Sequence, residues 1–156
     1  MIMYDAVSNL YLPAGAGAYA GYVNGKYADC PAIRKKFPKS RVFGIDVIGD
    51  GWENASIFDY EPGCIYSPLT LRYAVFKREQ FRPRTSVVYC DRDDLPAVTA
   101  ACAGLWYLVW IATLDGTVMT GERTAGDHLI VGTQIATVNR AGMEYDVSDI
   151  ESSWVR

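Results

Sequence analysis

Short apolar runs recur along the chain and are separated by turn-forming residues. Several of these runs are continuous rather than alternating, which is typical of strands buried on both faces. The pattern therefore predicts eight strands. They span Met3 to Ser8, Ala20 to Val23, Arg41 to Ile48, Ser56 to Tyr60, Thr85 to Cys90, Leu105 to Ala112, His128 to Gln134 and Glu144 to Val147.

The clearest helix signal lies between the fourth and fifth predicted strands. Ser67 is a favoured N-cap residue, and Pro68 fits the first helical position. Pro83 ends the helix because it restricts the residue before it. The apolar face is predicted from three residues at helical spacing: Leu69, Tyr73 and Phe76. The basic residues on or beside this helix are expected to form a solvated face: Arg72, Lys77, Arg78, Arg82 and Arg84.

Two shorter helices are predicted. One begins near Asp94, with Pro96 close behind, and stops at Gly104; the other covers Pro31 to Phe37. Alternation of strand and helix favours a parallel sheet with right-handed crossovers.

Eight strands predict an α/β fold in the form of a compact (β/α)8-like TIM barrel. Such a barrel usually needs about 250 residues, whereas this chain has 156. Several outer helices must therefore be shortened or replaced by loops, and Asn9 to Tyr19, rich in Ala and Gly, is predicted to be one such loop. We expect a single domain over residues 1–156.

Charge and hydropathy exclude some partners. The chain has 15 basic and 18 acidic residues, for a formal net charge of -3, which offers no field for a phosphate backbone. We therefore expect no nucleic acid partner. The apolar runs are too short to span a bilayer, and no basic segment precedes an apolar one at the N-terminus, so we expect no membrane span and no secretory signal.

The cysteines and the single histidine give no sign of a metal site. Cys30, Cys64, Cys90 and Cys102 are scattered without the spacing of zinc ligands, and His128 alone supports no catalytic triad. We expect no metal and free thiols, with two disulfides as the alternative.

The segment from Ile57 to Gly63 contains the most informative acids. Asp59 and Glu61 are two positions apart at the end of a predicted strand, so their side chains should project to the same side before Pro62 and Gly63 turn the chain away. Two carboxyls held close together tend to raise one pKa, which provides a general acid beside a carboxylate, as glycoside hydrolysis requires. The alternative is a solvated strand end.

Two more acids stand near strand ends. Asp5 follows the first apolar run and Asp146 lies in the last. If the strands are parallel and closed into a barrel, their carboxyl ends share the face where barrel active sites lie, and four acids converge. The alternative for each is a hydrogen-bonded turn residue.

The order of these segments resembles a small actinobacterial and phage group related to the glycoside hydrolase family 25 lysozymes. The resemblance covers nearly the whole chain and includes Trp154. It rests on Tyr4-Asp5, the segment from Ala20 to Tyr27, Phe58-Asp59-Tyr60-Glu61-Pro62-Gly63, Val88-Tyr89-Cys90, the segment from Tyr107 to Ala112, Gly132-Thr133-Gln134 and Tyr145-Asp146-Val147-Ser148.

The resemblance implies a muramidase that cleaves the β-1,4 bond between N-acetylmuramic acid and N-acetylglucosamine without a cofactor. It implies that Glu61 is the proton donor and that Asp59 stabilises the positive charge at the anomeric carbon or at the acetamido group. Asp5 and Asp146 would orient the site.

The resemblance is weaker at the positions that bind the sugar. The family usually has aromatic residues at the positions of Leu114 and Ile135, and these aliphatic side chains supply neither stacking nor a polar group. The substrate-binding candidates are Tyr60, Tyr89, Trp110 (or Tyr107), Gln134 and Trp52, which stands in a glycine-containing loop. Core or rim packing is the alternative for the strand aromatics.

Two functions remain open. The first is a peptidoglycan-directed glycoside hydrolase with peptidoglycan or a related wall glycan as its partner. The second is a weakly active or inactive virion, tail or wall-binding protein on the same fold, with virion or tail proteins as partners. The corresponding locations are a phage virion, export by a non-Sec route, or the cytoplasm.

Overall fold

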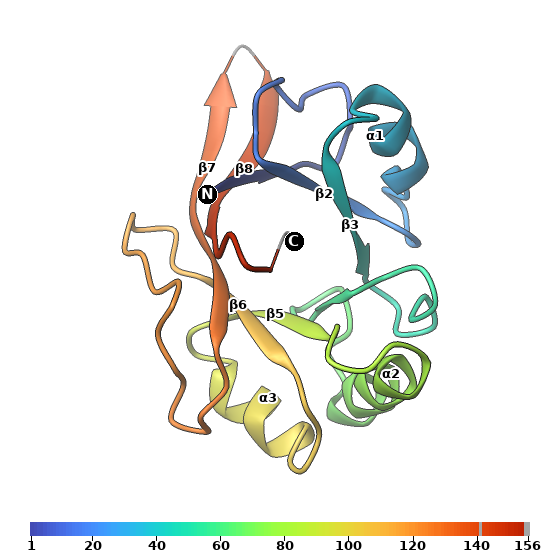
Figure 1. Cartoon of the computed structure of the whole chain (residues 1–156), viewed down its shortest axis with the longest axis vertical. Helices are drawn as coiled ribbons and strands as arrows, with labels where there is room; N and C mark the ends of the chain where they lie inside the picture. Colours follow the sequence, from blue (N-terminus) through green and yellow to red (C-terminus); the bar gives the residue numbers. More distant parts are fainter. Residues whose placement is uncertain (141, 155–156) are drawn as a thin grey trace.

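A computed structural model, which describes residues 1–140 and 142–154, shows eight strands closed into a barrel (Figure 1). Each strand pairs with the next along the chain, and the last pairs with the first. The prediction of eight strands in a barrel is confirmed. The strands are β1 Ile2–Asp5, β2 Ala18–Tyr22, β3 Arg41–Asp46, β4 Ile57–Asp59, β5 Val87–Asp91, β6 Leu108–Ala112, β7 Ile130–Arg140 and β8 Met143–Ile150.

The last strand runs against its neighbours. Strands β1 to β7 are parallel, but β8 is antiparallel to both β7 and β1, so the prediction of an entirely parallel sheet is wrong for β8. The physical reason is the connection: Arg140 pairs with Met143, and a parallel return would need a crossover of a dozen or more residues. The β7 and β8 hairpin is also longer than predicted and projects from one end of the ring of strands (Figure 1).

Three helices cover the outside of the barrel: α1 Cys30–Lys36, α2 Pro68–Phe81 and α3 Leu95–Ala101. The other connections are loops, including residues 6–17 and 113–129, which confirms the expectation of missing outer helices. Helix α2 begins as predicted, since the Ser67 side chain accepts a hydrogen bond from the Thr70 amide at 3.4 Å and Arg82 leaves the helix in an extended conformation.

The predicted buried face of α2 is wrong. Leu69 is 80% exposed, and Tyr73 and Phe76 are also exposed. The opposite face packs on the barrel, with Leu71, Ala74, Val75 and Arg78 buried. Large side chains already point outward from the strands beneath, namely Phe58 and Val88, so a helix face that includes a small alanine allows closer packing.

Arg78 departs from the predicted solvated face because it is buried, whereas Arg72 is exposed as predicted. The buried Arg78 guanidinium donates hydrogen bonds to the Thr85 hydroxyl at 2.9 Å and to the carbonyls of Trp52 and Glu53 at 3.0 and 3.2 Å. Arg72 donates to the carbonyls of Ala101 and Ala103 at the end of α3. These two arginines therefore connect α2 to its neighbouring segments.

Strand alternation divides the apolar residues into two layers. The inner layer fills the barrel and includes Met3, Ile57, Val87 and Trp110, while alternate residues on β4 to β6 face α2 and α3. The four cysteines are free thiols, three of them buried. Over the described residues, no helix has the length and apolar character needed to cross a membrane.

Candidate active site

A cleft of about 200 Å³ opens at the carboxyl ends of the parallel strands. Five carboxylic acids line this acid cleft, and no lysine, arginine or histidine is among its described lining residues. The acids come from β1, from the end of β4 and from β8. They are Asp5, Asp59, Glu61, Glu144 and Asp146.

Asp59 and Glu61 project into the acid cleft from the same side of the chain, as the strand spacing predicts. Asp59 is the last residue of β4, and the next amide, that of Tyr60, donates to the Tyr89 carbonyl at 2.9 Å and extends the pairing with β5. Gly63 then turns the chain with a positive φ of 92°, a conformation that favours glycine. The result places two carboxyls together at the end of one short strand.

Burial and like charge raise the pKa values of both acids. Burial first, and the Glu61 charge second, raise the pKa of Asp59 to about 7, against a lowering contribution from a hydrogen bond with the Cys64 thiol. Burial also raises the pKa of Glu61, as does Asp91, while a hydrogen bond from Tyr89 lowers it. Each of these neighbouring carboxyls therefore keeps its proton to a higher pH than a free carboxyl does.

Asp5 and Asp146 face each other across the antiparallel pair of β1 and β8. Burial raises the pKa of Asp5 well above its usual value, and the charges of Asp146, Asp59 and Glu61 raise it further. The pKa of Asp146 is raised by burial and lowered by the hydrogen bond that the Thr137 hydroxyl donates to it. Among the described residues, one oxygen of Asp5 and one of Asp59 are buried without a hydrogen-bond partner. These buried oxygens without partners are consistent with the desolvation that raises the pKa values of Asp5 and Asp59.

Three of the predicted substrate-binding residues lie together in the acid cleft. The Tyr89 hydroxyl donates to the Gln134 side-chain oxygen at 2.7 Å. The Tyr89 ring meets the Trp110 ring edge to face, with centroids 4.7 Å apart. The Trp110 indole nitrogen donates to the Ser148 hydroxyl at 3.1 Å, and this ring is almost fully buried. Tyr89, Trp110 and Gln134 therefore form a rigid floor beneath the acids.

The structure does not bring Tyr60, the alternative Tyr107 or Trp52 into the lining of the acid cleft. Tyr60 lies between two inward-facing acids, so strand alternation turns it outward, where its ring packs 5.3 Å from that of Tyr66. Tyr107 faces the same outer layer, where it stacks on His128. Trp52 is partly buried against the outer layer and is not part of the lining of the acid cleft, because its loop folds back onto the C-terminal end of α2.

The structure also adds cleft residues that the sequence reasoning missed. Tyr22 ends β2 and points inward, a position that strand alternation could have identified. Thr137 comes from the extension of β7 beyond the predicted strand, while Glu144 lies in the predicted last strand but was not predicted as a site residue. Leu114 lines the cleft at 56% exposure, whereas Ile135 is not among the lining residues.

The described residues offer no metal centre. Over residues 1–140 and 142–154, no group of three His, Cys, Asp or Glu side chains is arranged to hold a metal ion. The carboxyls of the acid cleft can supply proton donation and electrostatic stabilisation of a positive charge.

Comparison with solved structures finds the same fold in several enzymes. The muramidase from Acremonium alcalophilum superposes with a TM-score of 0.56 at 11% identity, over 99% of this chain and 96% of that one. This chain shares its fold with that muramidase. The muramidase from Trichobolus zukalii gives a TM-score of 0.57 at 11% identity, over 97% and 93% of the two chains. The bacterial lysozyme from Streptomyces coelicolor gives 0.56 at 12% identity, over 99% and 94%.

The muramidase fold confirms the resemblance to family 25 lysozymes at the level of architecture. By sequence, the chain matches no protein-family model and no curated protein. At 11 to 12% identity the likeness establishes the fold alone.

Proposed function

We propose that this protein is a peptidoglycan-directed glycoside hydrolase of the muramidase type. The observation that carries the proposal is the position of Asp59 and Glu61, two carboxyls with raised pKa values, side by side in the open end of the barrel. Peptidoglycan is the substrate class because the structures that share this fold are named muramidases and a lysozyme.

Glu61 is the proton donor in this proposal. Donation requires a carboxyl that a sugar can reach, and Glu61 is partly exposed while Asp59 is only 6% exposed. Glu61 would protonate the glycosidic oxygen as the bond from the anomeric carbon to that oxygen breaks, and the bonding electrons would leave with the oxygen.

Asp59 acts as the ionised carboxylate in this proposal. With a proton on Glu61, the Asp59 carboxylate can stabilise the positive charge at the anomeric carbon or at the substrate acetamido group. Water then adds to the anomeric carbon and returns a proton to Glu61, which restores the starting state. Asp5 and Asp146 would orient the sugar through acceptor oxygens above the floor of Tyr89, Trp110 and Gln134.

The test measures reducing sugar released from several cell-wall preparations by wild type, Glu61→Gln and Glu122→Gln. Glu122 is exposed and outside the acid cleft, so it provides a charge-matched control. We expect the rate of sugar release to fall at least about 100-fold in Glu61→Gln, with an unchanged unfolding temperature. Glu122→Gln should release sugar at the wild-type rate. Equal behaviour of wild type and Glu61→Gln on all walls would contradict the proposal.

A second function is favoured by Leu114, an exposed aliphatic residue at the edge of the acid cleft. An aliphatic side chain there supplies weak stacking for a sugar ring, which suits a wall-binding or virion protein on this fold that turns over slowly or not at all. Co-sedimentation with walls without release of sugar, together with stable association with tail proteins, would support this second function.

A further inference from the structure

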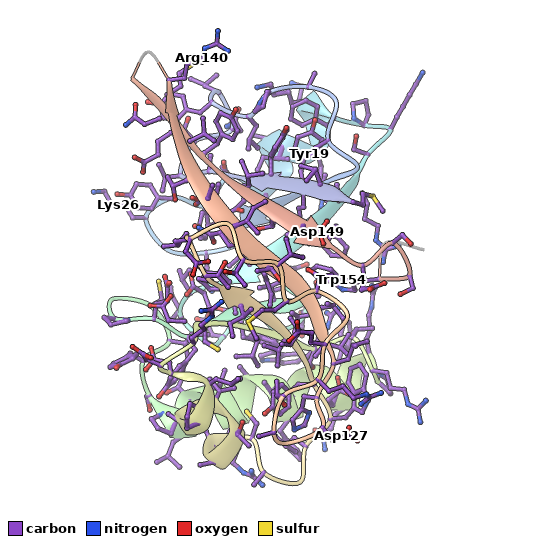
Figure 2. All side chains as sticks on the ribbon, turned by 90° about the vertical axis from the view of Figure 1, so that its left-hand side faces the viewer. Tyr19, Lys26, Asp127, Arg140, Asp149 and Trp154 are labelled. Atoms are coloured by element: carbon purple, nitrogen blue, oxygen red, sulfur yellow. The ribbon has the colours of Figure 1, made fainter. Side chains whose placement is uncertain are left out.

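A second and larger cavity lies at the other end of the barrel, at the amino ends of the parallel strands. Its volume is about 490 Å³, and its lining includes Arg41 and Leu108, the first residues of β3 and β6. Figure 2 shows Trp154, one of its lining residues, on the opposite side of the molecule from Lys26, which follows the carboxyl end of β2.

This arginine cavity has the opposite charge to the acid cleft. Glu53 is the single acid among its described lining residues. Arginines line it from α1, β3, α2 and the segment after α2. They are Arg34, Arg41, Arg78, Arg82 and Arg84. A chain with a net charge of -3 thus concentrates a third of its 15 basic residues around one cavity.

The buried Arg78 contributes a positive charge that no described carboxylate pairs with. Its donors go to two carbonyls and a hydroxyl. The adjacent Glu79 offsets part of this charge, but its oxygens accept hydrogen bonds from the backbone amides of Arg84, Thr85 and Ser86 at 2.7 to 3.3 Å. Positive charge at the base of the cavity therefore remains available to an anion.

The same Glu79 contacts hold the segment that carries two rim arginines. Arg84 has a φ of 60°, a left-handed conformation that is unfavourable for arginine, and its amide donates to Glu79 at 2.7 Å. Arg82 lies just before it, and both side chains are exposed. Among the described residues, Arg34, Arg82 and Arg84 form no ion pair with an acid. All three side chains are exposed at the rim; the Arg82 guanidinium also lies over the Phe81 ring, 5.5 Å from its centroid, a contact that leaves its N–H donors for a ligand.

Flat aromatic surfaces complete the wall. The Trp154 ring stacks on Phe43 with centroids 4.3 Å apart and an interplanar angle of 19°, and Trp106 is partly exposed beside the same cavity. Fixed indole rings bind the apolar face of a sugar, and guanidinium groups bind phosphate oxygens through paired hydrogen bonds. A ligand that carries both a ring and a phosphate fits this combination.

We propose that the arginine cavity binds a phosphorylated saccharide, with Arg34 and Arg82 on the phosphate and Trp154 against the sugar ring. The phosphate-bearing sugar has two sources, a free sugar phosphate or a phosphodiester-linked sugar polymer. The site is separate from the acid cleft and stands whether or not the protein hydrolyses peptidoglycan.

The experiment measures binding by calorimetry and by quenching of tryptophan fluorescence. The probes are a hexose phosphate, a phosphodiester-linked hexose polymer, unmodified hexose and single-stranded DNA. The proteins are wild type, Glu61→Gln, the double variant Arg34→Gln/Arg82→Gln, and the control Lys35→Gln/Lys39→Gln. The control lysines are exposed on the same segment, lie outside the cavity lining and change net charge equally.

We expect both phosphorylated saccharides to bind wild type and Glu61→Gln equally. The arginine variant should bind them at least about tenfold more weakly, while the lysine control stays within about twofold. A polymer that binds much more tightly than the monomer identifies the polymer as the source, and equal affinity identifies the free sugar phosphate. Three results would each overturn the proposal: no binding of either saccharide, equal losses in the two double variants, or binding of unmodified hexose or DNA as tight as that of the phosphorylated sugars.

Discussion

Asp5 on β1 lies directly opposite Asp146 on β8, in the register of an antiparallel pair. Like charges directly opposite each other destabilise a sheet, and here burial adds to the effect by raising the pKa values of both carboxyls. Folding therefore brings the Asp5 and Asp146 carboxyls together at a cost in unfolding free energy.

Asn in place of Asp5 should stabilise the protein at neutral pH. A carboxyl whose pKa is raised on folding binds its proton more tightly in the native state, so stability falls as pH rises from about 4 towards the raised pKa. Asp5→Asn removes that loss. We expect a gain on the order of 1 to 3 kcal/mol in unfolding free energy at pH 8 and none near pH 4.

Denaturant unfolding at several pH values measures this effect. Asp93→Asn, which replaces one exposed acid outside the acid cleft and keeps Asp5, is the control and should have the same pH dependence of stability as wild type. An Asp5→Asn variant with the same pH dependence of stability as wild type would show that Asp5 does not hold a raised pKa.

Phe in place of Tyr89 should raise the pKa of Glu61. A hydrogen bond from the Tyr89 hydroxyl lowers that pKa. The hydroxyl has one hydrogen and also lies 2.7 Å from the Gln134 side-chain oxygen; with the Gln134 amide rotated by a half-turn, its nitrogen donates to the Tyr89 oxygen and leaves that hydrogen for Glu61. Without the hydroxyl, Glu61 keeps its proton to higher pH, so the alkaline limb of the wall-hydrolysis profile should move upward.

Carbon-detected NMR titration of the Glu61 carboxyl gives the same pKa without requiring turnover. Tyr60→Phe is the matched control, since that ring faces the outer layer and its loss of a hydroxyl should leave the Glu61 titration unchanged. A Glu61 pKa that falls or stays the same in Tyr89→Phe would contradict the assigned contact.

Two leucines on α2 distinguish the buried face of this helix from the exposed one. Leu71 is fully buried, so Leu71→Ala should cost about 2 to 5 kcal/mol through lost burial and a residual cavity. Leu69 is 80% exposed, so Leu69→Ala should change stability by no more than about 0.5 kcal/mol. Urea unfolding of both variants measures the two losses of unfolding free energy. A larger loss in Leu69→Ala than in Leu71→Ala would show that Leu69, and not Leu71, packs against the barrel.

Much of the site could be predicted from the sequence because it depends on local geometry. The alternation of a strand places Asp59 and Glu61 on one side of the chain whatever surrounds them. The same rule turns Tyr60 outward, so strand alternation alone places this ring away from the acid cleft. Ser67 and Pro68 likewise specify the start of α2 through bonds within one turn.

Longer-range features could not be predicted in this way. The spacing of 3.6 residues fits both Leu69-Tyr73-Phe76 and the face that contains Leu71, and only the strands beneath decide which face is buried. Thr137 reaches the acid cleft because β7 extends beyond the predicted apolar run, where exposed polar residues carry no burial signal.

The sequence by itself determined the eight strands, the barrel, the start of α2 and the shared side of Asp59 and Glu61, because backbone periodicity and capping act over a few residues. Only the tertiary structure decided that β8 is antiparallel, that Asp5 meets Asp146, and that acids and arginines gather at opposite ends of the barrel. Those features arise when closure of the barrel brings residues together from distant parts of the chain, and burial then changes their charge states.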